Sequence, residues 1–117
     1  MIIATVLVAL VALLHLYFLV LEMFFWDKPR GRRIFNTTQE FATASKVLAA
    51  NQGLYNGFLA AGLVWGLLPG SPGRPVLVFF LGCVVAAGVY GALTVNKRIF
   101  FVQAVPALLA LAALLYF

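Results

Sequence analysis

The first 26 residues form an almost unbroken apolar run, MIIATVLVALVALLHLYFLVLEMFFW. A helix that crosses a membrane needs about 20 apolar residues, and this run is long enough. It is too long for the apolar core of a cleavable signal peptide, and no basic segment precedes it. The run therefore predicts a membrane-spanning helix over about residues 2–26.

The composition extends this prediction to the whole chain. Its 117 residues are 65% hydrophobic and 9% charged, whereas an ordinary soluble domain carries about 25% charged residues. Three further apolar segments lie at about 47–68, 76–95 and 99–117. We expect an all-α, polytopic membrane protein in which residues 1–117 form a single four-transmembrane-helix domain.

Basic residues lie almost entirely on one side of the predicted spans. Of the eight Lys and Arg residues, all but Arg74 fall in loops 27–46 and 96–98. They are Lys28, Arg30, Arg32, Arg33, Lys46, Lys97 and Arg98. The positive-inside rule places these two loops in the cytoplasm and both termini outside.

The end of the first loop carries a helix-start signal. Thr37 is followed three residues later by Glu40, which is the spacing of a capping box. This pattern predicts that Thr37 is the N-cap of a helix that continues from residue 38 into the second span.

Two titratable residues lie inside the first span, His15 and Glu22. Ionisable groups are costly in hydrocarbon, so within a membrane helix they indicate a functional site. Their spacing of seven places them on the same face about 10 Å apart, too far for a direct hydrogen bond.

The other polar residues of the spans fall in the half nearer the basic loops. Counting helical rise from the cytoplasmic ends predicts two depths. His15 and Asn56 share the deeper one, and Glu22, Asn51, Gln52, Tyr90 and Gln103 share the shallower one. A bundle held together only by packing has no reason to gather polar groups in one leaflet, so we predict a pocket there. Tyr55 and Trp26, at the same end, complete the predicted ligand-binding set.

Small residues and one proline indicate how the helices pack. Gly53 and Gly57 form a GxxxG pair, and Cys83, Ala87 and Gly91 repeat every fourth position, with Gly88 and Ala92 beside them. Such patterns favour close helix contact. Pro106 removes the helical partner of the Val102 carbonyl and should bend the last span beside Gln103.

Several stretches resemble a family of small bacterial four-helix membrane proteins known as domain of unknown function 1304. The stretches are His15-x-Tyr17, Leu21-Glu22-Met23-Phe24-x-Trp26, residues 51–62, Ala87-Gly88-x-Tyr90-Gly91-Ala92, and Gln103 with Pro106-Ala107. The resemblance covers all four segments and implies the same architecture and the bacterial inner membrane. It implies no activity.

Four functions agree with these features. The first is a binding protein that holds a membrane lipid or another lipophilic small molecule, with its head group on the polar residues. The second is an isomerase-like enzyme in which Glu22 and His15 shuttle a proton across an isoprenoid or sterol-like substrate, while Asn56 and Tyr90 stabilise charge. The third is a small transporter assembled as a homodimer, and the fourth is an accessory subunit of a membrane complex.

Other functions lack a signal. One His and one Cys offer no metal-ligand spacing, and no glycine-rich loop precedes a Lys-Ser/Thr pair. No basic helical face suits nucleic acid. We therefore expect neither metal, cofactor nor nucleic acid as a partner.

Overall fold

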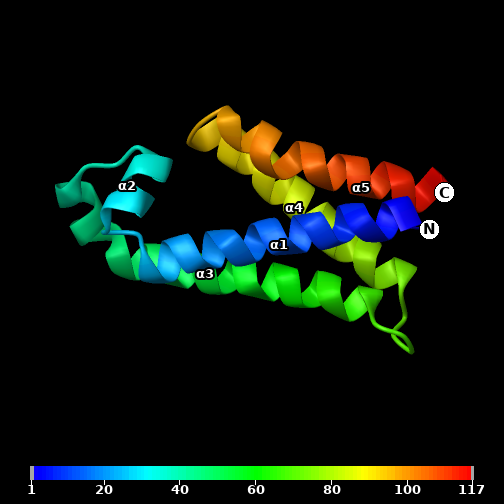
Figure 1. The fold of residues 1–117 in the computed structure, drawn as a ribbon. Coiled ribbons are helices and arrows are strands. Elements are labelled where there is room, and N and C mark those ends of the chain that lie inside the picture. The colour runs from blue at the N-terminus through cyan, green and yellow to red at the C-terminus, as the bar shows by residue number, and fades with distance from the viewer. Residues whose placement is uncertain (1, 117) are drawn as a thin grey trace. The chain divides into compact units, whose positions relative to one another are not determined.

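The structure is a computed structural model that describes residues 2–116, and all the regular structure in that range is helical. The helices are α1 (Ile2–Phe24), α2 (Pro29–Phe35), α3 (Gln39–Leu67), α4 (Arg74–Thr94), the π-helical segment η1 (Phe100–Ala104) and α5 (Val105–Tyr116). Figure 1 shows their order along the chain. The all-α prediction is confirmed at this level.

Contacts divide these residues into two compact units. The first unit comprises residues 2–13 and 59–116, and the second comprises residues 14–58. The long helices α1 and α3 each contribute residues to both units. The single membrane domain over 1–117 and its four-helix bundle stay predictions.

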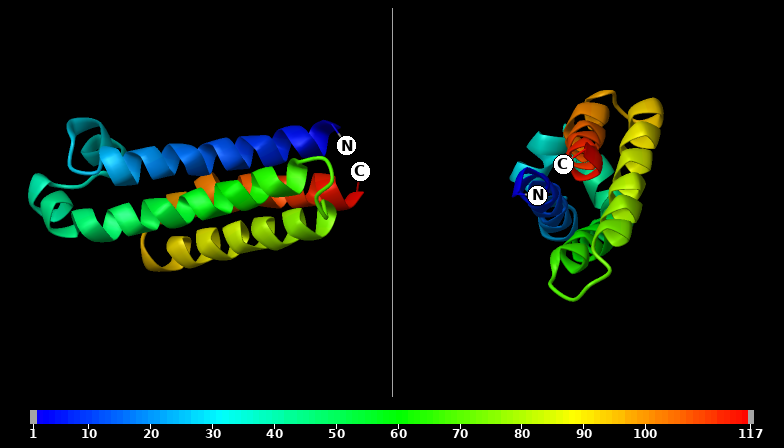
Figure 2. Two further views of the ribbon diagram at one scale, coloured as in Figure 1. Left: turned by 90° about the horizontal axis from the view of Figure 1, so that it is seen from below. Right: turned by 90° about the vertical axis from the view of Figure 1, so that its right-hand side faces the viewer.

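The first unit has an apolar core. Its largest fully buried side chains include Leu63 of α3, Leu81 and Val84 of α4, and Leu114 of α5. Within this unit α4 and α5 lie side by side and run in opposite directions (Figure 1), and the right-hand view of Figure 2 shows them next to each other. The short connection between them, 95–99, makes this antiparallel pairing the natural arrangement.

Glycines allow the helices of the first unit to approach closely. A Cβ added at Gly88 of α4 would lie 2.7 Å from the backbone nitrogen of Ala104, and one at Gly91 would lie 2.9 Å from Ile99. Gly88 is buried, whereas Ala87 of the predicted small-residue stripe is exposed. The close packing that the stripe predicted is therefore centred on Gly88 and Gly91.

Pro106 is accommodated by a π-helical turn that lies directly before it. The Val105 N–H donates to the Phe100 carbonyl, five residues back, and η1 covers Phe100–Ala104 with Gln103 inside it. Proline cannot donate a backbone hydrogen bond, so the preceding turn widens. The disturbance beside Gln103 was predicted, and its π-helical form was not.

In the second unit the end of α1 and the beginning of α3 lie antiparallel, with α2 between them in the chain (Figure 1). The Trp26 indole Nε1 donates to Ser45 Oγ at 3.0 Å, and the Lys46 ammonium lies 3.3 Å from the Asp27 carboxylate. The hydrogen bond from Lys46 holds the pKa of Asp27 below its usual value. These contacts fasten the ends of the two helices together.

The sequence patterns gave no prediction of α2. Pro29 occupies its first turn, where a missing N–H is harmless. Asn36 ends the helix with a left-handed φ of 55°, a conformation that Asn tolerates better than most residues. Gly31 is buried so tightly that an added Cβ would overlap the Phe25 carbonyl. The helix is thus held by a contact with the end of α1.

The predicted N-cap of α3 is wrong by one residue. Thr38 Oγ1 accepts the Phe41 N–H at 3.1 Å, so Thr38 is the cap and α3 begins at Gln39. Glu40 then falls at the second helical position and cannot complete a capping box. Thr37 Oγ1 is buried and has no hydrogen-bond partner within residues 2–116.

Within residues 2–116, two helices are long and apolar enough to cross a membrane, namely α1 and α4. Their bounds agree to about two residues with the predicted first and third spans. The last apolar stretch, Phe100–Tyr116, is shorter than these two helices. Helix α3 begins at Gln39, well before the predicted second span, because the predicted span counted only its apolar part and its first turns are polar.

The close approach at Gly88 leads to a stability prediction. Gly88→Ala should lower the free energy of unfolding by about 1–3 kcal/mol, since overpacking displaces the facing backbone. Gly82→Ala on the same helix is the control, because nothing lies within 4 Å of its added Cβ. Alanine there should stabilise the helix by up to about 1 kcal/mol. Thermal unfolding in maltoside micelles measures both variants, and an unchanged melting temperature for Gly88→Ala would contradict the packing.

Candidate functional site

The most unusual polar group of the second unit is the carboxylate of Glu22, which is 4% exposed. Its Oε2 accepts a hydrogen bond from Gln52 Nε2 at 3.0 Å, and its Oε1 accepts one from Asn56 Nδ2 at 2.5 Å. We call these three residues the Glu22 cluster. Both carboxylate oxygens are therefore satisfied by neutral amides from α3.

The positions along α3 explain why both amides reach one carboxylate. Gln52 and Asn56 are four residues apart, so they lie on the same side of the helix one turn apart. Gly53 lies beside them, and a Cβ added there would be 3.1 Å from Glu22 Cβ and 3.2 Å from the Leu19 carbonyl. The absence of a side chain at Gly53 brings α1 within reach of an asparagine, which is short.

Gly57 continues this contact one turn further along α3. A Cβ added at Gly57 would overlap the Leu19 side chain. The GxxxG pair of the sequence is therefore the surface on which the end of α1 packs against α3, as predicted for small residues at this spacing.

His15 lies on the same helix as Glu22 and is fully buried. Its ring meets Phe18 edge to face, with centroids 5.6 Å apart. The seven-residue spacing puts it two turns from Glu22. A proton shuttle between the two would have to bridge that distance, and the shuttle stays a prediction.

Three other predicted site residues of the second unit are turned to other partners. The Asn51 amide reaches back to the Val47 carbonyl of its own helix at 3.5 Å. Tyr55 is 60% exposed and stacks obliquely on Phe58, with centroids 5.9 Å apart. Trp26 bonds Ser45 and packs against Phe35.

The remaining two predicted site residues belong to the first unit. Tyr90 on α4 has 71% of its surface exposed, and Gln103 lies half-buried in η1. Their convergence with the Glu22 cluster stays a prediction.

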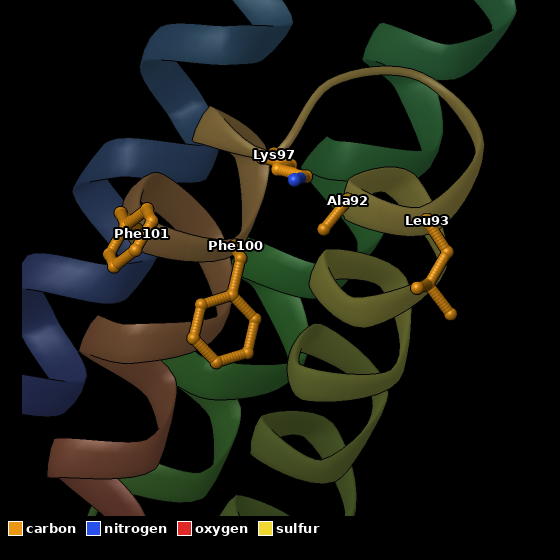
Figure 3. Close-up of a pocket in the computed structure, with 5 residues that line it drawn as sticks. All are labelled: Ala92, Leu93, Lys97, Phe100 and Phe101. Carbon is orange, nitrogen blue, oxygen red and sulfur yellow. The ribbon is translucent and has the colours of Figure 1, made fainter.

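The first unit also contains an open hollow of about 260 Å³ that the sequence did not indicate. It is lined by Ala92, Leu93, Lys97, Phe100 and Phe101 (Figure 3). Apart from the Lys97 amine the lining is apolar, and no site residue predicted from the sequence takes part. Adjacent aromatic residues after a basic turn are too common in membrane proteins to have served as a signal.

The chemistry of the Glu22 cluster follows from its groups. A carboxylate with two amides can accept hydrogen bonds, hold a proton or pair with a cation. Residues 2–116 contain no group of three or more His, Cys, Asp or Glu side chains that could hold a metal ion. No Lys or Arg in this range forms an ion pair with Glu22. The ion pair of the second unit joins Lys46 to Asp27.

Fold and site together define a small all-helical protein with two helices of membrane-spanning length and a buried carboxylate held by amides. Residues 9–115 match the model of the family described as "Protein of unknown function (DUF1304)", and the chain belongs to this family. It is 35% identical over 112 residues to the uncharacterized protein YpaA of Lactococcus lactis subsp. lactis (strain IL1403), covering 94% of both chains. No solved structure gives a significant match.

The two asparagines of α3 offer a matched test of the cluster. Asn56→Ala removes the donor to Glu22 Oε1 and should lower the free energy of unfolding by about 1–3 kcal/mol, because a buried acceptor loses its partner. Asn51→Ala removes an exposed side chain that reaches only its own helix, and it should change the stability by less than about 0.5 kcal/mol. Equal melting temperatures for the two variants would show that the Asn56 contact is not formed.

Proposed function

We propose that this protein is a four-span integral membrane protein that binds an amphipathic, lipid-like molecule, with the head group of the ligand at the Glu22 cluster. Both termini lie outside, and the basic loops lie in the cytoplasm of a bacterial cell. The cluster then sits in the cytoplasmic half of the membrane, near the end of α1 that leads into the first basic loop.

The observation that carries this proposal is the pairing of Glu22 with Gln52 and Asn56. A carboxylate within a helix of membrane-spanning length is costly to bury. Hydrogen bonds from polar side chains between membrane helices contribute only about 0.6 kcal/mol on average. Helix association alone therefore gives little reason to place a carboxylate here, whereas recognition of a polar head group gives a direct one.

The surroundings of the cluster suit an amphipathic ligand. Gln52 is exposed and Asn56 half-buried, so the polar groups are approached from the surface of α3. Tyr55 and Phe58, 60% and 56% exposed, continue from Gln52 around the same helix. Their rings offer apolar contact to a tail while the polar end remains at Glu22.

The alternative functions lack a comparable observation. An isomerase-like reaction needs His15 and Glu22 at one substrate, and they lie two helical turns apart. A dimeric transporter or an accessory subunit needs a partner surface, and no contact of the described residues indicates one. The binding function is therefore the one proposed.

The binding function is tested by NMR on protein labelled with ¹⁵N at its Asn and Gln side chains in maltoside micelles. The probes are three twelve-carbon amphiphiles: dodecylammonium, dodecanol and dodecanoate. At least one of them should shift the Gln52 and Asn56 amide signals saturably, because the head group competes for Glu22. The Gln39 amide, which donates to Thr43 at the start of α3 and lies more than three turns from Gln52, is the internal control.

A titration in which no probe moves the Gln52 and Asn56 signals would contradict the function. Shifts of equal size at Gln39 would do the same, because they would report general mixing with the micelle.

The topology has a separate test. In a Cys83→Ala background, Arg33→Cys should react with an impermeant maleimide only after cells are opened, whereas Arg74→Cys should react in intact cells. Both positions are exposed, so differences in reactivity report the side of the membrane. Labelling of Arg33→Cys from outside would overturn the orientation.

A further inference from the structure

The charge of the Glu22 cluster is not balanced by the protein side chains that hydrogen-bond to it. Gln52 and Asn56 are neutral, and no Lys or Arg in residues 2–116 pairs with Glu22. Amide donors solvate a carboxylate but leave its negative charge in place. We propose that the ligand supplies the opposite charge, and that its head group is an ammonium ion. This inference rests on the proposed function and names the ligand class.

The hydrogen-bond pattern fits an ionised carboxylate. Both oxygens of Glu22 accept an N–H, one from each amide. A protonated carboxyl would use one oxygen as an O–H donor and would need an acceptor there. The cluster therefore accommodates the ionised form of Glu22, and a counter-charge from a ligand would favour that form over the protonated one.

The polar groups of the cluster that are not used in its internal hydrogen bonds include further hydrogen-bond acceptors. Gln52 and Asn56 each use an N–H toward Glu22 and keep a carbonyl oxygen. A carboxylate with two carbonyls suits the N–H groups of a primary ammonium ion. A phosphate, sulfate or carboxylate head group would meet the Glu22 charge and be repelled.

The aromatic residues beside the Glu22 cluster also favour a positively charged ligand. The exposed ring of Tyr55 lies about 60° around α3 from Gln52, and it contacts Phe58 further round the helix. Aromatic faces attract cations by about 0.5–1 kcal/mol at exposed sites, and they also accept an alkyl chain. The Tyr55 ring therefore gives an alkylammonium ion an apolar, cation-attracting contact beside the cluster.

The three dodecyl probes share a twelve-carbon chain and have cationic, neutral and anionic head groups, so they test the ligand class directly. At pH 7.5, dodecylammonium should shift the Gln52 and Asn56 amides with an affinity about tenfold or more above that of dodecanol, as expected for pairing with a desolvated charge. Dodecanoate should be the weakest. Glu22→Gln, which retains the shape of the side chain, should bind dodecylammonium and dodecanol equally.

The outcomes separate this inference from the proposed function. If dodecanol or dodecanoate binds as tightly as dodecylammonium, the site binds amphiphiles but the ammonium class is wrong. If Glu22→Gln keeps the preference for dodecylammonium, the charge of Glu22 is not its source, and the inference is overturned. The comparison of probes on the unaltered protein remains decisive even if the variant does not fold.

Ethylammonium, which has no long tail, distinguishes a lipid-like ligand from a soluble amine. Weak or absent binding of ethylammonium beside tight binding of dodecylammonium supports an amphiphilic amine. Equal affinity would support the ammonium class and contradict the lipid-like part of the proposed function.

Discussion

The burial of one carboxylate is the constraint on which the second unit depends. Glu22 is 4% exposed, and a carboxylate in that setting requires hydrogen bonds to both oxygens. Amide groups supply them from α3, and they reach Glu22 only because Gly53 and Gly57 let α1 approach. The hydrogen bonds to Glu22 therefore depend on the close packing of α1 against Gly53 and Gly57, and a change in either contact alters the other.

Counting depth along a helix did not predict the direction of each polar side chain, and it placed Asn56 with His15, whereas Asn56 contacts Glu22. Gln52 and Asn56 meet Glu22 because they differ by only about 40° around α3, whereas Asn51 lies about 100° from Gln52 and points elsewhere. The sequence places Asn51 and Gln52 at one depth and Asn56 one turn deeper, and only the packing of α1 against α3 selects the two that meet Glu22. The same limit applies to Tyr55, which shares the depth of the cluster and lies exposed beside it.

The helix ends show which parts of the fold local sequence can predict. Changes from apolar to polar composition placed the ends of α1 and α4 to about two residues. The seven-residue helix α2 has no apolar period of its own, and it is held by the contact of Gly31 with the end of α1. Thr37 and Thr38 are equivalent by type, so the backbone at the start of α3 decides which one caps it. Pro106 predicts a break, but a proline can be accommodated by a kink or by a wider turn, and its position alone does not predict the π-helical form of η1.

The two carboxylates near the end of α1 have different partners, and their exposure explains the difference. Asp27 lies beyond the helix, where the Lys46 ammonium pairs with it and remains 56% exposed. A lysine at the depth of Glu22 would have to bury a second charge, and the desolvation of both ions can exceed their attraction. Amides avoid that penalty because they donate hydrogen bonds without carrying charge. The consequence is a buried carboxylate whose hydrogen-bond partners are neutral, and this arrangement is the basis on which we propose a cationic ligand.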